Sequence, residues 1–131
     1  MNKTIMDKRK LQLSWKGYYK YTESNVQKYS PVKAGVYKVG IRQQGGKLAV
    51  RYIGQTNNLD RRLKEHLDFE NEENECLVKR LRKYDARFSF AEVSSQSDRD
   101  GAEKALYDNY KPVCNDTDVI PNGPDININV R

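Results

Sequence analysis

Two short runs of β-branched and aromatic residues, separated by a glycine-containing turn, form the clearest pattern along the chain. Both runs lie within Gly35–Thr56 and are rich in Val, Ile and Tyr, which is typical of strands. Gln43–Lys47 lies between them, and its Gly45-Gly46 pair supplies the positive φ angles that a hairpin turn requires. This pattern predicts a β-hairpin.

Helical periodicity follows the hairpin in three segments. Asn57–Leu67 begins with asparagines that suit a helix N-cap, and its leucines recur at every fourth position. In Cys76–Tyr84 the apolar residues also fall on one helical face. The last helix begins near Ser97 or Asp98, either of which can cap it, and ends at Pro112.

Further strands are indicated by alternation of apolar and polar residues. Arg87–Val93 places Phe88 and Phe90 on one face and predicts a strand. Leu11–Trp15 alternates and could form another short strand, and Asp125–Arg131 could add an edge strand or remain a loose tail. The fold class that we predict is α+β, with a small three-stranded antiparallel sheet, made of the hairpin and Arg87–Val93, flanked by helices.

The composition indicates one modest domain with a polar surface. The chain has 131 residues, a hydrophobic fraction of 37% and a mean hydropathy of −0.95, so its core must be small. No apolar run exceeds three residues, which excludes a membrane-spanning helix and the apolar centre of a signal peptide. We therefore expect a soluble, cytoplasmic protein with no membrane partner.

The excess positive charge is concentrated at the N-terminus. The first 33 residues hold eight of the 24 Lys and Arg residues but only two of the 18 Asp and Glu residues. Gly17–Tyr21 also mixes tyrosines with lysines. Such a segment can bind nucleic acid through phosphates and stacked bases, or it can be a solvated arm whose tyrosines pack on the domain. The candidate contacts to nucleic acid are Lys16, Lys20, Lys33, Lys38 and Arg62.

Three other features allow more than one interpretation. The predicted helix Cys76–Tyr84 carries four basic residues, which could reach a DNA backbone or form only a solvated face. The acidic stretch Phe69–Glu75 should be an exposed loop away from any nucleic-acid surface, since its carboxylates would repel phosphate. Cys76 and Cys114 fit no metal-ligand spacing and are interpreted as reduced, partly buried thiols, although a disulfide stays open.

Glu103 is the best local indication of a functional site. It shares one side of its predicted helix with Tyr107 and Tyr110, beside Leu106. Burying a lone carboxylate among such residues is costly. Glu103 should therefore have a cationic partner, either a basic side chain or a metal ion.

Two tyrosine–glycine motifs and the helix after them resemble those of a known family. Gly35–Tyr37 is followed by Tyr52–Gly54, and Arg62 and His66 lie in the next predicted helix. In this order and spacing they resemble the GIY-YIG nuclease domain, whose members include homing endonucleases, some restriction enzymes and the incision subunit of nucleotide excision repair. The resemblance spans Lys33–Asp116.

The resemblance implies a metal-dependent endonuclease that hydrolyses phosphodiester bonds in DNA. Tyr37 would be the general base, or would pass the proton of water onward, and Tyr52 would position water or phosphate. Arg62 would stabilise the phosphate, and His66 would relay the proton or bind phosphate. Glu103 would hold Mg²⁺ or Mn²⁺.

The resemblance also implies a division of the chain. Residues 33–118 would form the nuclease domain, with a basic, aromatic extension over 1–32 and a tail over 119–131. No specificity domain is recognisable, so we expect DNA to be selected by structure or only weakly by sequence, with no obligate protein partner. The residues with structural rather than chemical roles would be Gly35, Gly54 and Asn115.

Each catalytic assignment has a structural alternative. Tyr37 and Tyr52 could be a packed cross-strand pair, and Arg62 and Glu103 could form an ion pair between helices. The domain as a whole could be a non-catalytic nucleic-acid-binding module. The catalytic interpretation requires these side chains to meet on one concave surface wide enough for a phosphate.

Overall fold

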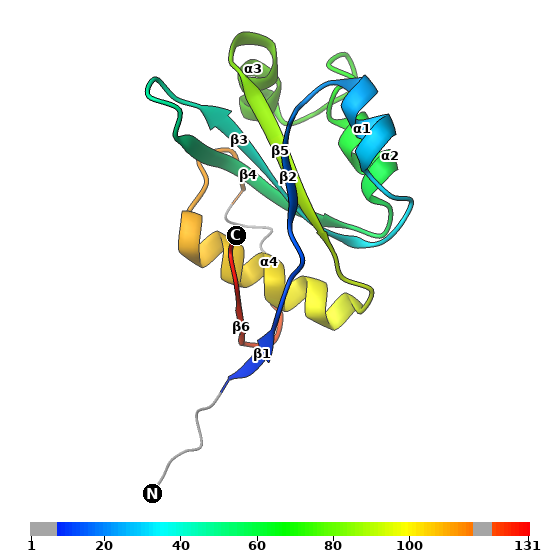
Figure 1. The fold of residues 1–131 in the computed structure, drawn as a ribbon, viewed down its shortest axis with the longest axis vertical. Helices are drawn as coiled ribbons and strands as arrows, with labels where there is room; N and C mark the ends of the chain where they lie inside the picture. The colour runs from blue at the N-terminus through cyan, green and yellow to red at the C-terminus, as the bar shows by residue number, and fades with distance from the viewer. Residues whose placement is uncertain (1–7, 117–121) are drawn as a thin grey trace, which may run out of the picture.

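A twisted antiparallel sheet with helices packed on both faces forms the centre of the molecule (Figure 1). The structure is a computed structural model that describes residues 8–116 and 122–131. In chain order the elements are β1 (Arg9–Leu11), β2 (Lys16–Lys20), α1 (Glu23–Tyr29), β3 (Gly35–Arg42), β4 (Leu48–Thr56), α2 (Leu59–Glu65), α3 (Glu75–Lys83), β5 (Ala86–Glu92), α4 (Gln96–Tyr110) and β6 (Ile126–Ile128).

The predicted hairpin is present and forms half of the main sheet. β3 and β4 pair antiparallel, with Tyr37 opposite Gly54, and the turn between them places Gly45 and Gly46 at φ angles of 92° and 90°. β5 pairs with the other side of β3, which gives the strand order β2-β5-β3-β4. β4 is therefore an edge strand, and no strand within residues 8–116 and 122–131 pairs with its outer side.

The predicted α+β class is confirmed, but the predicted number of strands is wrong. The main sheet has four strands because β2 pairs with β5, and a separate two-stranded parallel sheet joins β1 to β6. The sequence of β2, Lys-Gly-Tyr-Tyr-Lys, lacks the alternation that predicts a strand. Tyr19 nevertheless packs against the core, so burial of its ring favours the strand where the pattern does not.

Alternating residues of the sheet divide the core into two layers. Tyr37, Val39 and Phe88 face the layer that α1, α2 and α3 cover, whereas Val36 and Ile53 face α4. Figure 1 shows α4 apart from the other three helices, on the other side of the strands. Two neighbouring residues of one strand can therefore belong to different layers of the molecule.

Side-chain caps fix where the helices begin. Asn58 and Asn74 cap α2 and α3 by accepting backbone N–H bonds of 3.0 Å. α4 begins earlier than expected, because Ser95 rather than Ser97 or Asp98 is its N-cap. The sequence did not predict α1, which buries a single residue and so has no apolar stripe.

Both described chain ends pack on the side of the sheet that α4 covers. Leu13 and Trp15 contact this layer, and the Trp15 indole donates a 2.9 Å hydrogen bond to the Asn129 carbonyl. The expected domain boundary between residues 118 and 119 lies outside the described residues, and the division of the chain stays a prediction. Within residues 8–116 and 122–131, no helix is long and apolar enough to cross a membrane.

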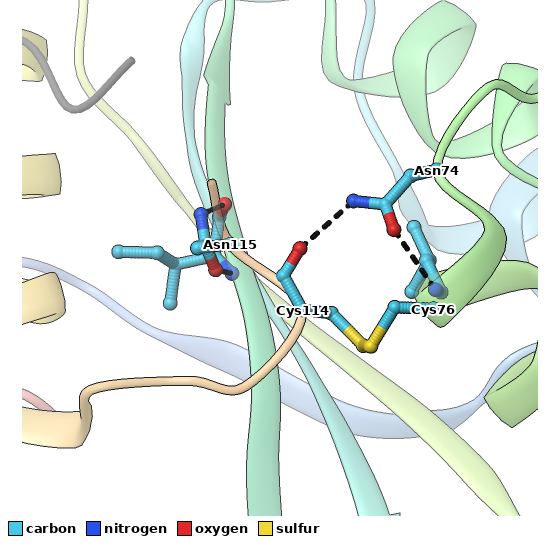
Figure 2. Close-up of a disulfide and its surroundings, with 6 residues drawn as sticks. Asn74, Cys76, Cys114 and Asn115 are labelled. Carbon is cyan, nitrogen blue, oxygen red and sulfur yellow. Dashed lines mark hydrogen bonds between the residues drawn. A yellow bond between two sulfur atoms is a disulfide. The ribbon is translucent and has the colours of Figure 1, made fainter. Parts of the chain in front are cut away.

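Cys76 and Cys114 form a disulfide, which corrects the interpretation of both as reduced thiols. Their sulfur atoms are 2.07 Å apart and their Cα atoms 5.3 Å apart, a spacing that disulfides require. Figure 2 shows the bond joining the start of α3 to the segment after α4, where Asn74 donates a 2.9 Å hydrogen bond to the Cys114 carbonyl. The sequence could not reveal this proximity, because the cysteines are 38 positions apart.

Candidate active site

Tyr37 lies at the centre of the candidate site; Gly54 makes room for its ring, and Gly35 lets β3 lie close to β5. The Tyr37 ring covers Gly54, where an added Cβ would lie 2.4 Å from the phenol oxygen. A Cβ on Gly35 would lie 2.3 Å from the Ala91 carbonyl oxygen on β5. A side chain at either position would therefore displace Tyr37 or separate the strands, which explains the need for glycine.

A chain of hydrogen bonds runs from Tyr37 through His66 to Glu72. Tyr37 Oη lies 2.7 Å from His66 Nε2, and His66 Nδ1 lies 2.7 Å from Glu72 Oε1. The Tyr37 residue is 1% exposed, and the side chains of His66 and Glu72 are 0% and 7% exposed. These side chains therefore form their hydrogen bonds with one another and not with bulk water.

The surroundings define which atoms of this chain carry protons. Burial, and then the charge of Arg62, lowers the pKa of His66, so its ring is neutral near pH 7. Burial alone would raise the pKa of Glu72, but hydrogen bonds from the Asn74 backbone and His66 hold that pKa below its usual value. Burial raises the pKa of Tyr37. Tyr37 O–H therefore donates to Nε2, and Nδ1–H donates to the ionised Glu72.

Glu72 is a residue of the candidate site that the sequence analysis missed. The stretch Phe69–Glu75 is exposed at Glu70 and Glu73, as expected. Glu72 instead turns inward to His66, so the expectation that the whole stretch is an exposed loop is wrong at this residue. That the stretch lies away from nucleic acid stays a prediction. In the sequence, only its position six residues after His66 connects Glu72 to the site. That spacing alone predicts no contact, because the path of the loop decides whether the two side chains meet.

Tyr52 and Arg62 lie on the same side of the sheet as Tyr37. The Tyr52 ring meets the His66 ring edge to face, with centroids 5.3 Å apart. Burial raises the pKa of both phenols, and the charge of Arg62 partly opposes that rise. The Arg62 side chain is 36% exposed and pairs with Glu65 at 3.2 Å. Exposed ion pairs of this kind are weak, so a phosphate could replace Glu65.

Glu103 approaches the site from the opposite face of the sheet. It lies on α4 and accepts a 3.2 Å hydrogen bond from Gln55, which pairs with Val36 and so faces α4. The expectation of one concave surface on a single face is therefore wrong. Because β4 is an edge strand, Glu103 is still close enough for its charge to raise the pKa of Tyr37 and Tyr52. Candidate groups on the two faces of the sheet therefore act on one another electrostatically beside β4.

The surroundings of Glu103 suit a divalent cation. Burial raises its pKa to about 7, a rise that the Gln55 hydrogen bond opposes and Asp100 adds to. In the described part of the chain Glu103 forms no ion pair, which removes the alternative of a structural pair with Arg62. A buried carboxylate without a basic partner is costly, and a cation would remove that cost.

The same surroundings indicate what kind of ion would fit. Among residues 8–116 and 122–131, no group of three or more His, Cys, Asp or Glu residues could hold a metal. A fitting ion must therefore keep most of its water ligands. Mg²⁺ commonly binds in this way, through one or two carboxylates, waters and substrate phosphate oxygens.

Asn115 occupies the open edge of β4 (Figure 2). Its Oδ1 accepts a 2.8 Å hydrogen bond from the Ile53 backbone N–H, and its Nδ2 donates a 2.9 Å bond to the Ile53 carbonyl. The Asn115 side chain thus makes the two backbone hydrogen bonds that a neighbouring strand would make, next to Tyr52. The Cys114 N–H bonds the Arg51 carbonyl at 2.9 Å, so the disulfide and Asn115 brace the edge strand together.

Three of the lysines expected to contact nucleic acid lie at the surface, away from these side chains. Lys16 and Lys20 are exposed on β2, at the opposite edge of the sheet from β4. Lys33 is exposed, and its ammonium lies 3.8 Å from a Glu92 carboxylate oxygen. Among the expected contacts, Arg62 alone lies beside Tyr37 and Tyr52.

Lys38 lies in the interior and not at the expected nucleic-acid surface. It is 1% exposed, and its ammonium lies 4.0 Å from the centre of the Trp15 ring. The same ammonium donates a hydrogen bond to the Val130 carbonyl. The N- and C-terminal segments cover this side chain, and a strand pattern alone does not reveal such a cover.

Comparison with protein families identifies the domain that these residues form. A family model for the GIY-YIG catalytic domain matches residues 33–116. The chain belongs to the GIY-YIG family. It therefore carries a nuclease catalytic domain, which confirms the resemblance seen in the sequence and the enzyme class. The match begins at Lys33 and so leaves out β2, which the structure adds to the GIY-YIG sheet.

Solved structures of another GIY-YIG domain share the fold. The N-terminal endonuclease domain of UvrC from Thermotoga maritima, bound to magnesium, is 22% identical with a TM-score of 0.54, and the match covers 72% of this chain and 100% of that one. A point mutant of that domain, bound to the catalytic divalent cation, is 21% identical with a TM-score of 0.54 and covers 72% and 99%. Among curated proteins, none matches the chain.

Proposed function

We propose that the protein is a metal-dependent endonuclease that hydrolyses phosphodiester bonds in DNA at a site built around β4. The observation that carries this proposal is the 2.7 Å contact between Tyr37 Oη and His66 Nε2. A buried phenol bonded to a neutral imidazole can accept one proton while it gives up another. Membership of a nuclease family supports the same conclusion.

Tyr37 is the proposed general base, acting with His66. As the attacking water gives its proton to Tyr37 Oη, the phenol proton moves to His66 Nε2. No free phenolate is needed, which matters because burial raises the pKa of Tyr37. His66 is fully buried, so we assign it the proton relay and not phosphate binding. Glu72 then stabilises the imidazolium through its bond to Nδ1.

Arg62 and Tyr52 are the proposed contacts to the substrate. Both side chains are partly exposed, in contrast to Tyr37. The guanidinium of Arg62 presents paired donors that match phosphate oxygens, and a phosphate would replace its exposed partner Glu65. Tyr52 would position the attacking water, whose proton must reach the neighbouring Tyr37.

Glu103 is the proposed ligand of Mg²⁺ or Mn²⁺. The related UvrC domain is bound to magnesium, and the buried carboxylate of Glu103 lacks a basic partner within the described residues. When bound, such an ion supplies positive charge for the phosphate oxygens and the leaving group. Gln55 would hold the carboxylate in place through its hydrogen bond.

DNA selected by structure, or only weakly by sequence, is the proposed substrate. The decisive experiment incubates supercoiled, linear and branched DNA with the wild type and with Glu103→Gln, in Mg²⁺ and in chelator. We expect cleavage by the wild type in Mg²⁺ alone, and a loss of at least about 100-fold in Glu103→Gln. Cleavage that survives the substitution would contradict the metal assignment. Binding without cleavage under every metal condition would favour the alternative, a non-catalytic binding module.

A further inference from the structure

The end of the sheet that carries the β3–β4 turn gathers positive charge at a distance from Tyr37. Arg42, Arg51 and Arg80 line one pocket there, together with Tyr84. They come from three elements: β3, β4 and α3. Among residues 8–116 and 122–131, none of these arginines forms an ion pair. Their charges are therefore free to act on an external anion.

A β-bulge places one of these arginines outside the regular pairing of the hairpin. Val39 pairs with Tyr52, but the next residue of β3, Gly40, pairs with Val50. Arg51 is thus the extra residue, without a partner on β3. Bulges redirect side chains and are frequent beside functional sites. Here the bulge turns a guanidinium toward the pocket one residue before Tyr52.

The positive charge continues across the same end of the sheet. Lys20 pairs with Arg87 between β2 and β5, and the Arg42 N–H bonds the Asp85 carbonyl at 2.9 Å. Arg87 holds the Asp85 carboxylate through bonds of 2.9 and 3.1 Å. These bonds lower the pKa of Asp85, and the charges of Arg87, Arg42 and Lys20 lower it further. One carboxylate thus lies among three cations, which leaves a positive surplus.

We propose that this basic end of the sheet, formed by Lys20, Arg42, Arg51, Arg80 and Arg87, binds the phosphate backbone of duplex DNA beside the cleavage site. The inference rests on the proposed function for its choice of DNA. Several guanidinium and ammonium groups spread over four strands and a helix match a repeating chain of phosphates better than a single small anion. Counterion release by such groups strengthens binding without reading sequence.

The register of β3 predicts how far this contact lies from the scissile phosphate. Arg42 follows Tyr37 by five residues on one strand, which is roughly 17 Å at about 3.3 Å per residue. Along one DNA strand phosphates rise about 3.4 Å each. A duplex that runs along the sheet would therefore reach the basic end about five base pairs from the cut.

The test compares two variants with the same change of charge. The first carries R42Q, R51Q and R80Q, which remove the guanidiniums of the pocket. The matched control carries K10Q, K28Q and K111Q, at exposed positions on other elements that do not line the pocket. Binding of a labelled duplex of about 20 base pairs is measured by fluorescence anisotropy in chelator at several salt concentrations, after thermal unfolding shows that each variant is folded.

We expect the pocket variant to lose at least about tenfold in DNA affinity at low salt. The slope of log binding constant against log salt concentration should become shallower by up to about 2.7, because three phosphate contacts are removed. The control should change by about twofold or less. An equal loss in both variants, or no loss in the pocket variant, would overturn the inference. The binding assay contains chelator and so does not depend on cleavage. If the wild type binds the duplex but does not cleave DNA in a separate assay with Mg²⁺, that result contradicts only the proposed function.

Discussion

At the scale of single residues, the candidate site depends on contacts between groups that cannot act alone. Tyr37 has a raised pKa, His66 a lowered one, and Glu72 supplies the charge that a protonated His66 needs. The resemblance to the GIY-YIG domain implied site roles for Tyr37, Tyr52, Arg62, His66 and Glu103, and these roles stay proposals. The sequence could not predict Glu72, because an irregular loop brings that carboxylate inward and no periodicity marks it.

Replacement of Glu72 tests the proton path. Glu72→Gln keeps the shape of the side chain but removes the charge that stabilises an imidazolium. We expect the cleavage rate constant at saturating DNA to fall roughly 10- to 100-fold, with little change in DNA affinity. The control is Glu73→Gln, because Glu73 is the exposed neighbour. Equal rates for the two variants would contradict a positioning role for Glu72.

The pH dependence of stability tests the burial of Glu103. Burial raises its pKa from 4.5 to about 7, so the folded protein binds this proton more tightly than the unfolded chain does. The Glu103 contribution to the free energy of unfolding is therefore present below pH 4.5 and is lost as the pH rises to about 7, by at most about 3 kcal/mol. Glu103→Gln should lack this loss.

The measurement is urea denaturation of both proteins in chelator at pH 5 and pH 8. Between pH 5 and pH 8, the wild type should lose more unfolding free energy than Glu103→Gln does. Added Mg²⁺ should restore stability to the wild type at pH 8 and leave the variant unchanged. A difference that does not vary with pH would show that Glu103 is ionised without penalty in the folded protein.

At the scale of elements, the edge strand β4 determines the shape of the site. In the part of the chain that the structure describes, its outer side has no strand partner, and Asn115 and the Cys114 backbone take that place. The hairpin and three of the helices were predictable because each has a strong local pattern. β2 and α1 were not, since β2 lacks alternation and α1 lacks an apolar stripe, and tertiary packing determines both.

Loss of the disulfide tests how far the edge strand depends on its brace. The bond between Cys76 and Cys114 closes a loop of 38 residues, so removing it should lower the unfolding free energy by about 2–4 kcal/mol. Thermal unfolding of the wild type with and without reductant, and of the variant with both cysteines replaced by serine, measures this. Reductant should leave the variant unchanged. Equal stability of oxidised and reduced wild type would contradict the role of the bond.

At the scale of the whole molecule, the two described ends of the chain complete the layer that α4 covers. The side chain of Asn129 bonds both the N–H and the carbonyl of Leu13, at 2.6 and 2.8 Å. Trp15 and the C-terminal segment cover Lys38. The resemblance implied an extension before the nuclease domain and a tail after it. The sequence could not reveal that the two segments meet, because their contacts join residues more than 100 positions apart and leave no mark in a local pattern.

Replacement of Asn129 tests this closure. Asn129→Ala should leave the Leu13 backbone groups unpaired and lower the free energy of unfolding by about 1–3 kcal/mol. Fluorescence of Trp15, the one tryptophan in the chain, should shift to longer wavelength as water reaches the ring. Asn127→Ala, at an exposed position of β6, is the control. Equal stability of the two variants would contradict the closure.

A double-mutant cycle on DNA cleavage tests most directly whether groups from both faces of the sheet form one site. Single-turnover rates are measured in Mg²⁺ for the wild type, Tyr37→Phe, Glu103→Gln and the double variant. If Tyr37 and Glu103 act as a unit across β4, the double variant should be within about tenfold of the slower single variant. A double variant slowed by the full product of the two single effects would contradict the account.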